Sequence, residues 1–77
     1  MSRVVVASTT LAAVSYFPHR HLLELEFRNG AIYRYFDVPP QDYHELLAAD
    51  SKGSYFNRHI RSCFPYQQIR SPSRTAG

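Results

Sequence analysis

The chain has 77 residues, nine of them basic and six acidic, which gives a formal net charge of +3 and a pI near 9.4. This length permits one domain close to the lower limit for a stable core, and a hydrophobic content of 44% excludes a disordered chain. A single cysteine excludes an intrachain disulfide and a cysteine-based zinc cage, so we expect a reducing cytoplasm and no metal or other cofactor. No apolar run approaches the length of a membrane span. Eight of the nine basic residues are arginines, which favour anionic partners.

Strand patterns occupy the first half of the chain. Residues 4–7 are typical of a short strand or arm, and residues 11–17 form an apolar, partly β-branched or aromatic run typical of a strand. A turn at residues 18–20 separates this run from residues 22–28, where apolar and acidic side chains alternate as in a half-buried strand. A third strand is expected at residues 31–37, which completes an antiparallel meander.

The turn between the second and third strands allows two registers. A two-residue Asn29-Gly30 loop would place Arg34 opposite Leu25, on the apolar face. A three-residue loop with Gly30 in the left-handed conformation places Arg34 opposite Glu24 instead. We prefer the second register, because it keeps charge out of the core and pairs opposite charges across the strands. It sets Leu25 against Tyr33 and Leu23 against Tyr35, and it turns Ile32 and Phe36 toward the glutamate face of the sheet.

The second half of the chain has helical periodicity. It begins after Pro39-Pro40 and predicts helices at about residues 40–49 and 51–62. Proline suits the first turn of the first helix, and Asp50-Ser51 offers good N-caps for the second. Pro65 ends the second helix.

We therefore predict a single α+β domain over residues 1–70, with a three-stranded antiparallel β-meander packed on two C-terminal α-helices. Residues 66–69 are expected to add a short extended segment, and residues 71–77 are expected to form a flexible C-terminal tail. The expected core consists of Val14, Leu23, Leu25, Phe27, Tyr33, Tyr35, Leu46, Leu47, Phe56 and Ile60.

Tyr33 and Tyr35 share one face of the third strand and allow two interpretations. Exposed tyrosines could stack nucleic-acid bases as an aromatic platform on the sheet. Packed tyrosines would hold the sheet to the helices and keep their hydroxyls at the rim. The preferred register favours packing.

Basic residues on the second helix are the candidate binding surface. Arg58 and Arg61 lie three residues apart on the expected outer face. Lys52, Arg70 and Arg74 could join them in a basic strip that contacts phosphates. A solvated helix face that serves solubility explains the same residues equally well.

Two pairs of reactive side chains could form a metal site or a catalytic pair, but the sequence gives little support for either. His19 and His21 share a face if extended, but two ligands without a third make a poor metal site. His59 and Cys63 are four residues apart on the expected inner face of the second helix, which allows a nucleophile pair. Because no orienting carboxylate is evident, we expect a buried and inert thiol at Cys63, and a protein that is not an enzyme.

Taken together, these residues resemble the KTSC domain, over about residues 4–66. This family is named after a segment at the C-terminus of some lysyl-tRNA synthetases and also occurs as free-standing small bacterial and phage proteins. The resemblance brings no catalytic residues. The motif residues that match, which we expect to be mainly structural, are Tyr33, Tyr35, Pro39, Gly53, Tyr55, Phe56 and Asn57.

The resemblance also suggests a function, because the synthetase association points to nucleic acid, and to RNA before DNA. We therefore expect a small non-enzymatic binding module that contacts RNA through a basic helix face. The alternative is a protein-interaction or homo-oligomerising module that acts through Ile32, Phe36 and an exposed strand edge. The residues expected to contact RNA are Lys52, Arg58, Arg61 and Arg70.

Overall fold

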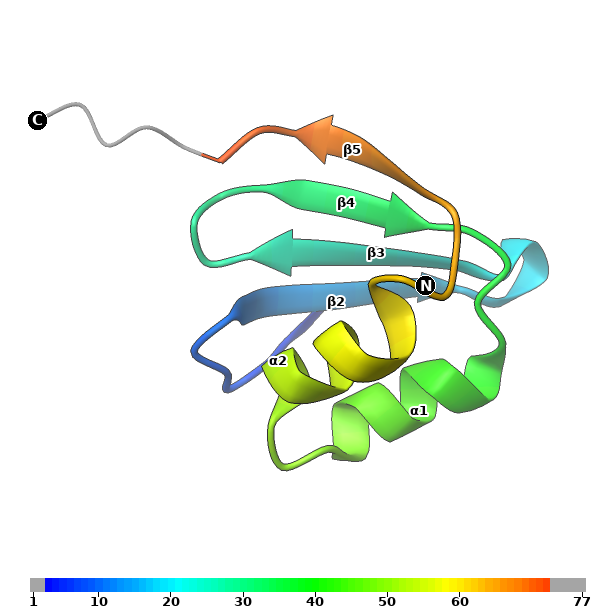
Figure 1. Cartoon of the computed structure of the whole chain (residues 1–77), viewed down its shortest axis with the longest axis horizontal. Coiled ribbons are helices and arrows are strands. Elements are labelled where there is room, and N and C mark those ends of the chain that lie inside the picture. Colours follow the sequence, from blue (N-terminus) through cyan, green and yellow to red (C-terminus); the bar gives the residue numbers. More distant parts are fainter. Residues whose placement is uncertain (1–2, 73–77) are drawn as a thin grey trace, which may run out of the picture.

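The computed structural model describes residues 3–72, which form one sheet and a pair of helices (Figure 1). The strands are β1 (Arg3–Val5), β2 (Leu11–Phe17), β3 (Leu22–Phe27), β4 (Ile32–Tyr35) and β5 (Tyr66–Arg70). The helices are the 3-10 turn η1 (Pro18–Arg20), α1 (Pro40–Ala48), α2 (Lys52–Tyr55) and the π-helical η2 (Phe56–Ile60), which directly continues α2.

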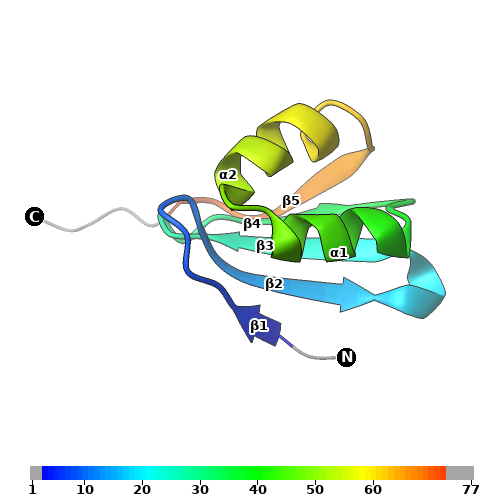
Figure 2. The same cartoon turned by 90° about the horizontal axis from the view of Figure 1, so that it is seen from below.

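The five strands make one antiparallel sheet in the order β1-β2-β3-β4-β5, and α1 and α2 cover one of its faces (Figure 2). The α+β class is confirmed, but the prediction of a three-stranded sheet is wrong. The strands β2, β3 and β4 are the predicted meander, whereas β1 and β5 pair with its two outer edges. The expected extended segment at residues 66–69 coincides with β5, but its place in the sheet is not predicted, because the exposed residues of this strand show no apolar alternation. Residues 66–70 form a strand because their backbone pairs with the open edge of β4.

The preferred register of the central hairpin is confirmed. Glu24 pairs with Arg34 and Leu25 pairs with Tyr33. The Arg34 Nε donates a hydrogen bond of 2.9 Å to Glu24 Oε1, so the charges pair on the face away from the core. Gly30 has φ 93°, a left-handed conformation that glycine adopts without steric cost.

The core lies between the sheet and the helices. Three of the predicted core residues, Phe27, Tyr33 and Leu47, are only partly buried and pack against its border. The other predicted core residues are all buried: Val14, Leu23, Leu25, Tyr35, Leu46, Phe56 and Ile60. The core also contains four residues outside the prediction, namely Val6, Leu11, Tyr16 and Val38.

Two tyrosines attach the first helix to the sheet. The hydroxyl of Tyr16, on β2, donates a hydrogen bond of 2.5 Å to the carbonyl of Val38, just before α1. The Tyr16 ring also stacks on Tyr43 of α1, with ring centroids 4.8 Å apart. These contacts hold the start of α1, at Pro40, against the sheet.

The second helix widens into a π turn, which changes the residues on its inner face. The Arg61 N–H donates to the Phe56 carbonyl at 2.8 Å, an i→i+5 bond that gives this turn an extra residue. Ile60 is fully buried, but His59 and Cys63 are exposed. The prediction that His59 and Cys63 line the inner face, with a buried thiol, is therefore wrong.

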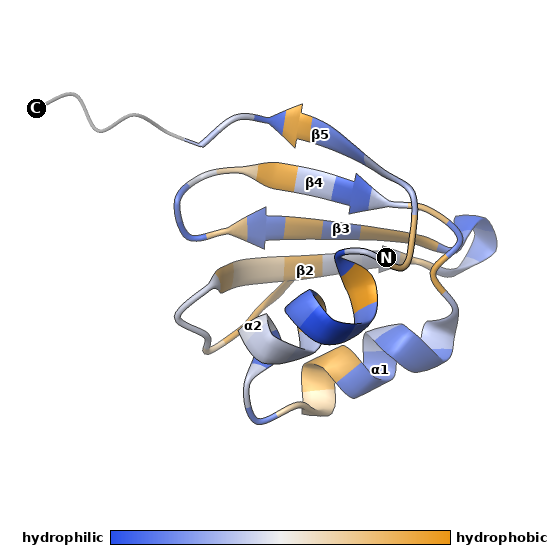
Figure 3. Ribbon diagram, in the orientation of Figure 1, coloured by the Kyte–Doolittle hydropathy of each residue, from blue (hydrophilic) through white to orange (hydrophobic). Residues whose placement is uncertain are grey.

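Hydrophilic residues dominate the outward-facing parts of the fold, including most of β5 and the middle of the second helix (Figure 3). Within residues 3–72, no helix is long and apolar enough to cross a membrane. Of the predicted tail, residues 71 and 72 are exposed. Residues 73–77, with Arg74, lie outside the described part of the chain.

Candidate functional site

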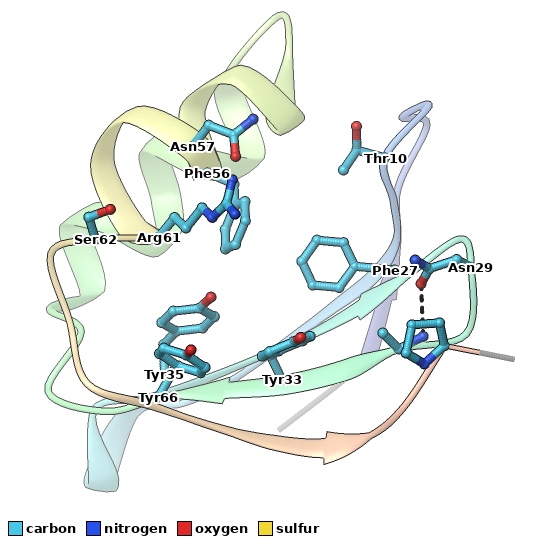
Figure 4. Close-up of a pocket in the computed structure, with 12 residues that line it drawn as sticks. Thr10, Phe27, Asn29, Tyr33, Tyr35, Phe56, Asn57, Arg61, Ser62 and Tyr66 are labelled. Carbon is cyan, nitrogen blue, oxygen red and sulfur yellow. Dashed lines mark hydrogen bonds between the residues drawn. The ribbon is translucent and has the colours of Figure 1, made fainter.

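An open groove of about 540 Å³ lies between the second helix and strands β4 and β5 (Figure 4). The side chains of Phe56 and Arg61 extend from the helix toward tyrosines of the sheet. The turn at Asn29 and Ala31 and the loop residue Thr10 close one end. The groove therefore combines segments that are distant in the sequence.

Three tyrosines, with Phe27 of β3 beside them, form the sheet side of the groove. Tyr33 and Tyr35 share a face because they are two residues apart on β4, and Tyr66 on β5 pairs directly with Tyr35. The Tyr66 ring centroid lies 5.4 Å from that of Tyr35 and 5.7 Å from that of Tyr33. On the helix side, Phe56 packs edge-on against Tyr35 at 5.5 Å. The result is a continuous aromatic surface.

Exposure increases along this surface from the core to the solvent. Tyr35 is only 3% exposed, Tyr33 is partly buried, and Tyr66 is 57% exposed. The two interpretations of the Tyr33–Tyr35 pair thus apply to different rings, because Tyr35 packs in the core and Tyr33 borders the open groove. Tyr66 was not predicted as a site residue, and its one sequence signal is an aromatic residue directly after Pro65.

Among the described residues, the polar lining of the groove carries positive charge and no carboxylate. It includes Arg61, Asn57 and Ser62 from the helical segment and Asn29 from the hairpin. The Asn29 Oδ1 already accepts a hydrogen bond of 3.0 Å from the Ala31 N–H. Between residues 3 and 72, the two ion pairs involve Arg3 and Arg34, so Arg61 forms no ion pair there.

The surroundings of the Tyr35 hydroxyl change its pKa. Burial and then the neighbouring Tyr66 and Tyr33 raise the pKa of Tyr35 to about 12. The positive charge of Arg61 acts in the opposite direction and lowers this pKa. The guanidinium of Arg61 is therefore close enough to act on the Tyr35 hydroxyl.

The structure separates the four predicted RNA-contacting residues. Arg61 borders the groove, and Arg58 is exposed on the same helix but does not line the groove. Lys52 donates to the Ala49 carbonyl at 3.2 Å and lines a different hollow of about 460 Å³ together with Arg28. Arg70 pairs with Ile32, whose side chain belongs to the opposite face of the sheet. These four residues do not form one continuous strip.

Several residues of the matching motif have contacts that hold the elements together. The single proton of the Tyr55 hydroxyl is shared between Glu45 Oε1 at 2.8 Å and Asp42 Oδ1 at 3.2 Å, which links the second helix to α1. Pro39 is the N-cap residue of α1. Gly53 is buried, and a Cβ atom there would lie 2.6 Å from the Thr10 Oγ1. The motif residues Tyr33, Tyr35, Phe56 and Asn57 line the groove.

His19 and His21, the two candidate metal ligands, have no third ligand beside them within residues 3–72. His19 is in η1, and His21 follows it in a left-handed conformation with φ 49°. Within residues 3–72, no three side chains of His, Cys, Asp or Glu gather as a potential metal site.

Comparison with known proteins gives a consistent family match. The model of a family described as the KTSC domain matches residues 7–64. An uncharacterised protein from Stutzerimonas stutzeri is 47% identical over 58 residues, which cover 75% of this chain and 82% of that protein. A lysine–tRNA ligase from Nostoc sp. is 44% identical over 59 residues, which cover 77% of this chain but 10% of the ligase. The crystal structure of a KTSC domain protein from Yersinia pestis has a TM-score of 0.84 at 31% identity, over 90% of this chain and 97% of that chain.

Proposed function

The chain belongs to the KTSC domain family, and on that basis we propose that it is a small, non-enzymatic module that binds RNA. By name, its lysine–tRNA ligase relatives act on an RNA. The shared segment covers only 10% of such a ligase, so we carry over the RNA partner and not the ligase reaction.

The placement of Arg61 is the observation that carries this proposal. Its guanidinium stands at a groove that has aromatic walls and no carboxylate in its lining. A guanidinium without a carboxylate partner keeps its donors for an external anion, and a phosphate group matches its planar fork. Arg58, exposed three residues earlier, adds a second positive charge on the same helix.

The other two residues predicted to contact RNA act at long range in this proposal. Lys52 and Arg70 lie away from the groove and contribute to the positive field that attracts a polyanion. No catalytic residue is assigned, because the described residues of the groove lining include no carboxylate, histidine or cysteine that could activate the Ser62 hydroxyl.

Fluorescence anisotropy with labelled single-stranded and hairpin RNA tests this function. We expect the dissociation constant to rise steeply between about 50 and 200 mM salt, because phosphate contacts release counterions. Arg61→Ala should weaken binding several-fold and reduce the salt slope by about 1. Arg20→Ala is the matched control, since it removes the same charge from an exposed position on η1 that does not line the groove.

Charge reversal gives the sharper outcome. Arg58→Glu combined with Arg61→Glu should abolish measurable binding while the circular dichroism spectrum stays unchanged, because both side chains are exposed. RNA binding that ignores both the salt concentration and this double reversal would refute the proposal.

A second candidate function, self-association, has one specific observation in its favour. Val5 on β1 is 72% exposed, and strand pairing places it on the face that the helices leave uncovered, in one row with the partly exposed Glu26 and Ile32 and the buried Ala13. This row would dock a second copy of the chain. Light scattering should then show a dimer at high protein concentration, and Val5→Asp should restore the monomer. A strict monomer at all concentrations would exclude it.

A further inference from the structure

We propose that the aromatic groove is a nucleotide pocket, which takes one unstacked base against Tyr66 and Tyr33 and its phosphate at Arg61. This inference rests on the proposed RNA binding, and it adds the part of the RNA that the groove recognises. It also identifies the groove residues, not the helix face alone, as the source of selectivity for unpaired RNA.

The size and shape of the groove suit a nucleotide. Its volume of about 540 Å³ lies within the roughly 300–1,000 Å³ range of small-molecule sites. The helix forms one wall and the sheet forms the other, so a ligand enters from the open side (Figure 4). A base within a duplex is stacked between its neighbours, and only an unpaired base can turn out toward such a surface.

The aromatic surface is open to a ligand on one side and packed against the core on the other. Tyr66 is 57% exposed and so presents ring area to a ligand. Behind it, Tyr35 is buried and held edge-on by Phe56, which supports the outer rings from the core. Bases stack on tyrosine rings of this kind without regard to their identity, because every base has a π face.

The polar groups are complementary to the rest of a nucleotide. Arg61 supplies the cation for the phosphate, and no carboxylate in the lining repels that anion. Asn57 is exposed at the groove, and its amide has both a donor and an acceptor for the edge of a base. Aromatic rings, an amide and a guanidinium together match a base, its edge and its phosphate.

The test measures RNA binding by variants of β5. Tyr66→Ala should lower the affinity for unpaired RNA about tenfold through the loss of one stacking contact. Tyr66→Phe, which keeps the ring, should bind within about twofold of the wild type, because stacking on a ring does not need the hydroxyl. Ile69→Ala is the matched control, since Ile69 is exposed on the same strand and does not line the groove.

Two ligand series distinguish the possible sources of the nucleotide. The first is a short homopolymeric RNA, with and without an abasic nucleotide in its centre. The second is the set of free 5′-mononucleotides, followed by the amide and ring signals of the groove residues in an NMR titration. We expect the intact RNA to bind, the abasic RNA to bind about tenfold more weakly, and Tyr66→Ala to bind both RNAs equally.

The outcomes separate this inference from the proposed function. If RNA binds with strong salt dependence but Tyr66→Ala binds as tightly as the wild type, the nucleotide pocket is refuted and RNA binding stands. If free nucleotides shift the groove signals and RNA does not bind, the groove is a nucleotide site, but its role in RNA recognition is refuted together with the RNA-binding function. If neither ligand binds, both are refuted.

Discussion

Replacing Gly53 by alanine should destabilise this protein, although the same change stabilises an ordinary helix. In an open helical position, alanine is favoured over glycine by about 1 kcal/mol. Gly53 lies in α2 against the turn that precedes β2, and an added Cβ would meet the Thr10 Oγ1 at 2.6 Å and the Thr10 Cβ at 3.1 Å. Rotation of the threonine side chain can move Oγ1, but it leaves the Cβ in place.

The size of the effect follows from these two contacts. Overpacking of this kind costs about 1–3 kcal/mol, and the gain in helix propensity offsets about 1 kcal/mol of it. We expect a net loss of about 1 kcal/mol in the free energy of unfolding of Gly53→Ala, which corresponds to a fall in Tm of about 4–8 °C for a domain of this size. In a Thr10→Ala background the closest contact is absent, so Gly53→Ala should be nearly neutral there.

Urea unfolding followed by circular dichroism measures the four proteins of this double-mutant cycle. We expect a coupling free energy of about 1 kcal/mol between the two positions. Ser54→Ala is the control, because Ser54 is the next residue in the same helix and its side chain is exposed. Two results would refute the reasoning. One is a Gly53→Ala variant with the same change in the free energy of unfolding as Ser54→Ala. The other is an equal loss of free energy from Gly53→Ala in the wild-type and Thr10→Ala backgrounds.

Three further changes test individual contacts. Tyr55→Phe should lower the free energy of unfolding by about 1 kcal/mol in urea titration, because its hydroxyl donates to Asp42 and Glu45, and an unchanged stability would contradict this. Because burial raises the pKa of Tyr35 from 10.0 to about 12, its neutral form stabilises the fold fully below pH 10, and this contribution is lost as the pH rises through 12. Between about pH 8 and pH 11, Tyr35→Phe should therefore lose about 1 kcal/mol less stability than the wild type, and equal losses would contradict this. Cys63 is exposed and should react with a thiol reagent in the native protein as fast as in urea, whereas protection until unfolding would contradict its position.

The central hairpin and the family could be predicted from the sequence because their signals are local. The register follows from keeping Arg34 off the apolar face and opposite Glu24, and the structure confirms it. The matched family region, residues 7–64, likewise lies within the predicted extent of the resemblance. Strand alternation, turn chemistry and motif spacing all act over a few residues, so a single sequence displays them.

The candidate site was predicted less completely. The sequence predicts that Tyr33 and Tyr35 pack between the sheet and the helices. It predicts that Arg61 lies on the outer face of the second helix, apart from these tyrosines. Nothing local indicates that Tyr66 joins the tyrosines of β4, because all residues of β5 are exposed and the strand has no alternating pattern. The π turn that ends in the hydrogen bond from Arg61 to Phe56 also has no local sequence signature.

The sequence by itself determined the three central strands, the register of the central hairpin and the approximate places of both helices. Only the tertiary structure decided that the sheet has five strands, that Cys63 is exposed, and that Arg61 stands over an aromatic groove. The physical reason is the range of the interactions. Alternation, capping and cross-strand charge act between neighbours in the chain or across one tight turn. An edge strand and a groove arise when residues as distant as Tyr35 and Tyr66 meet on one sheet.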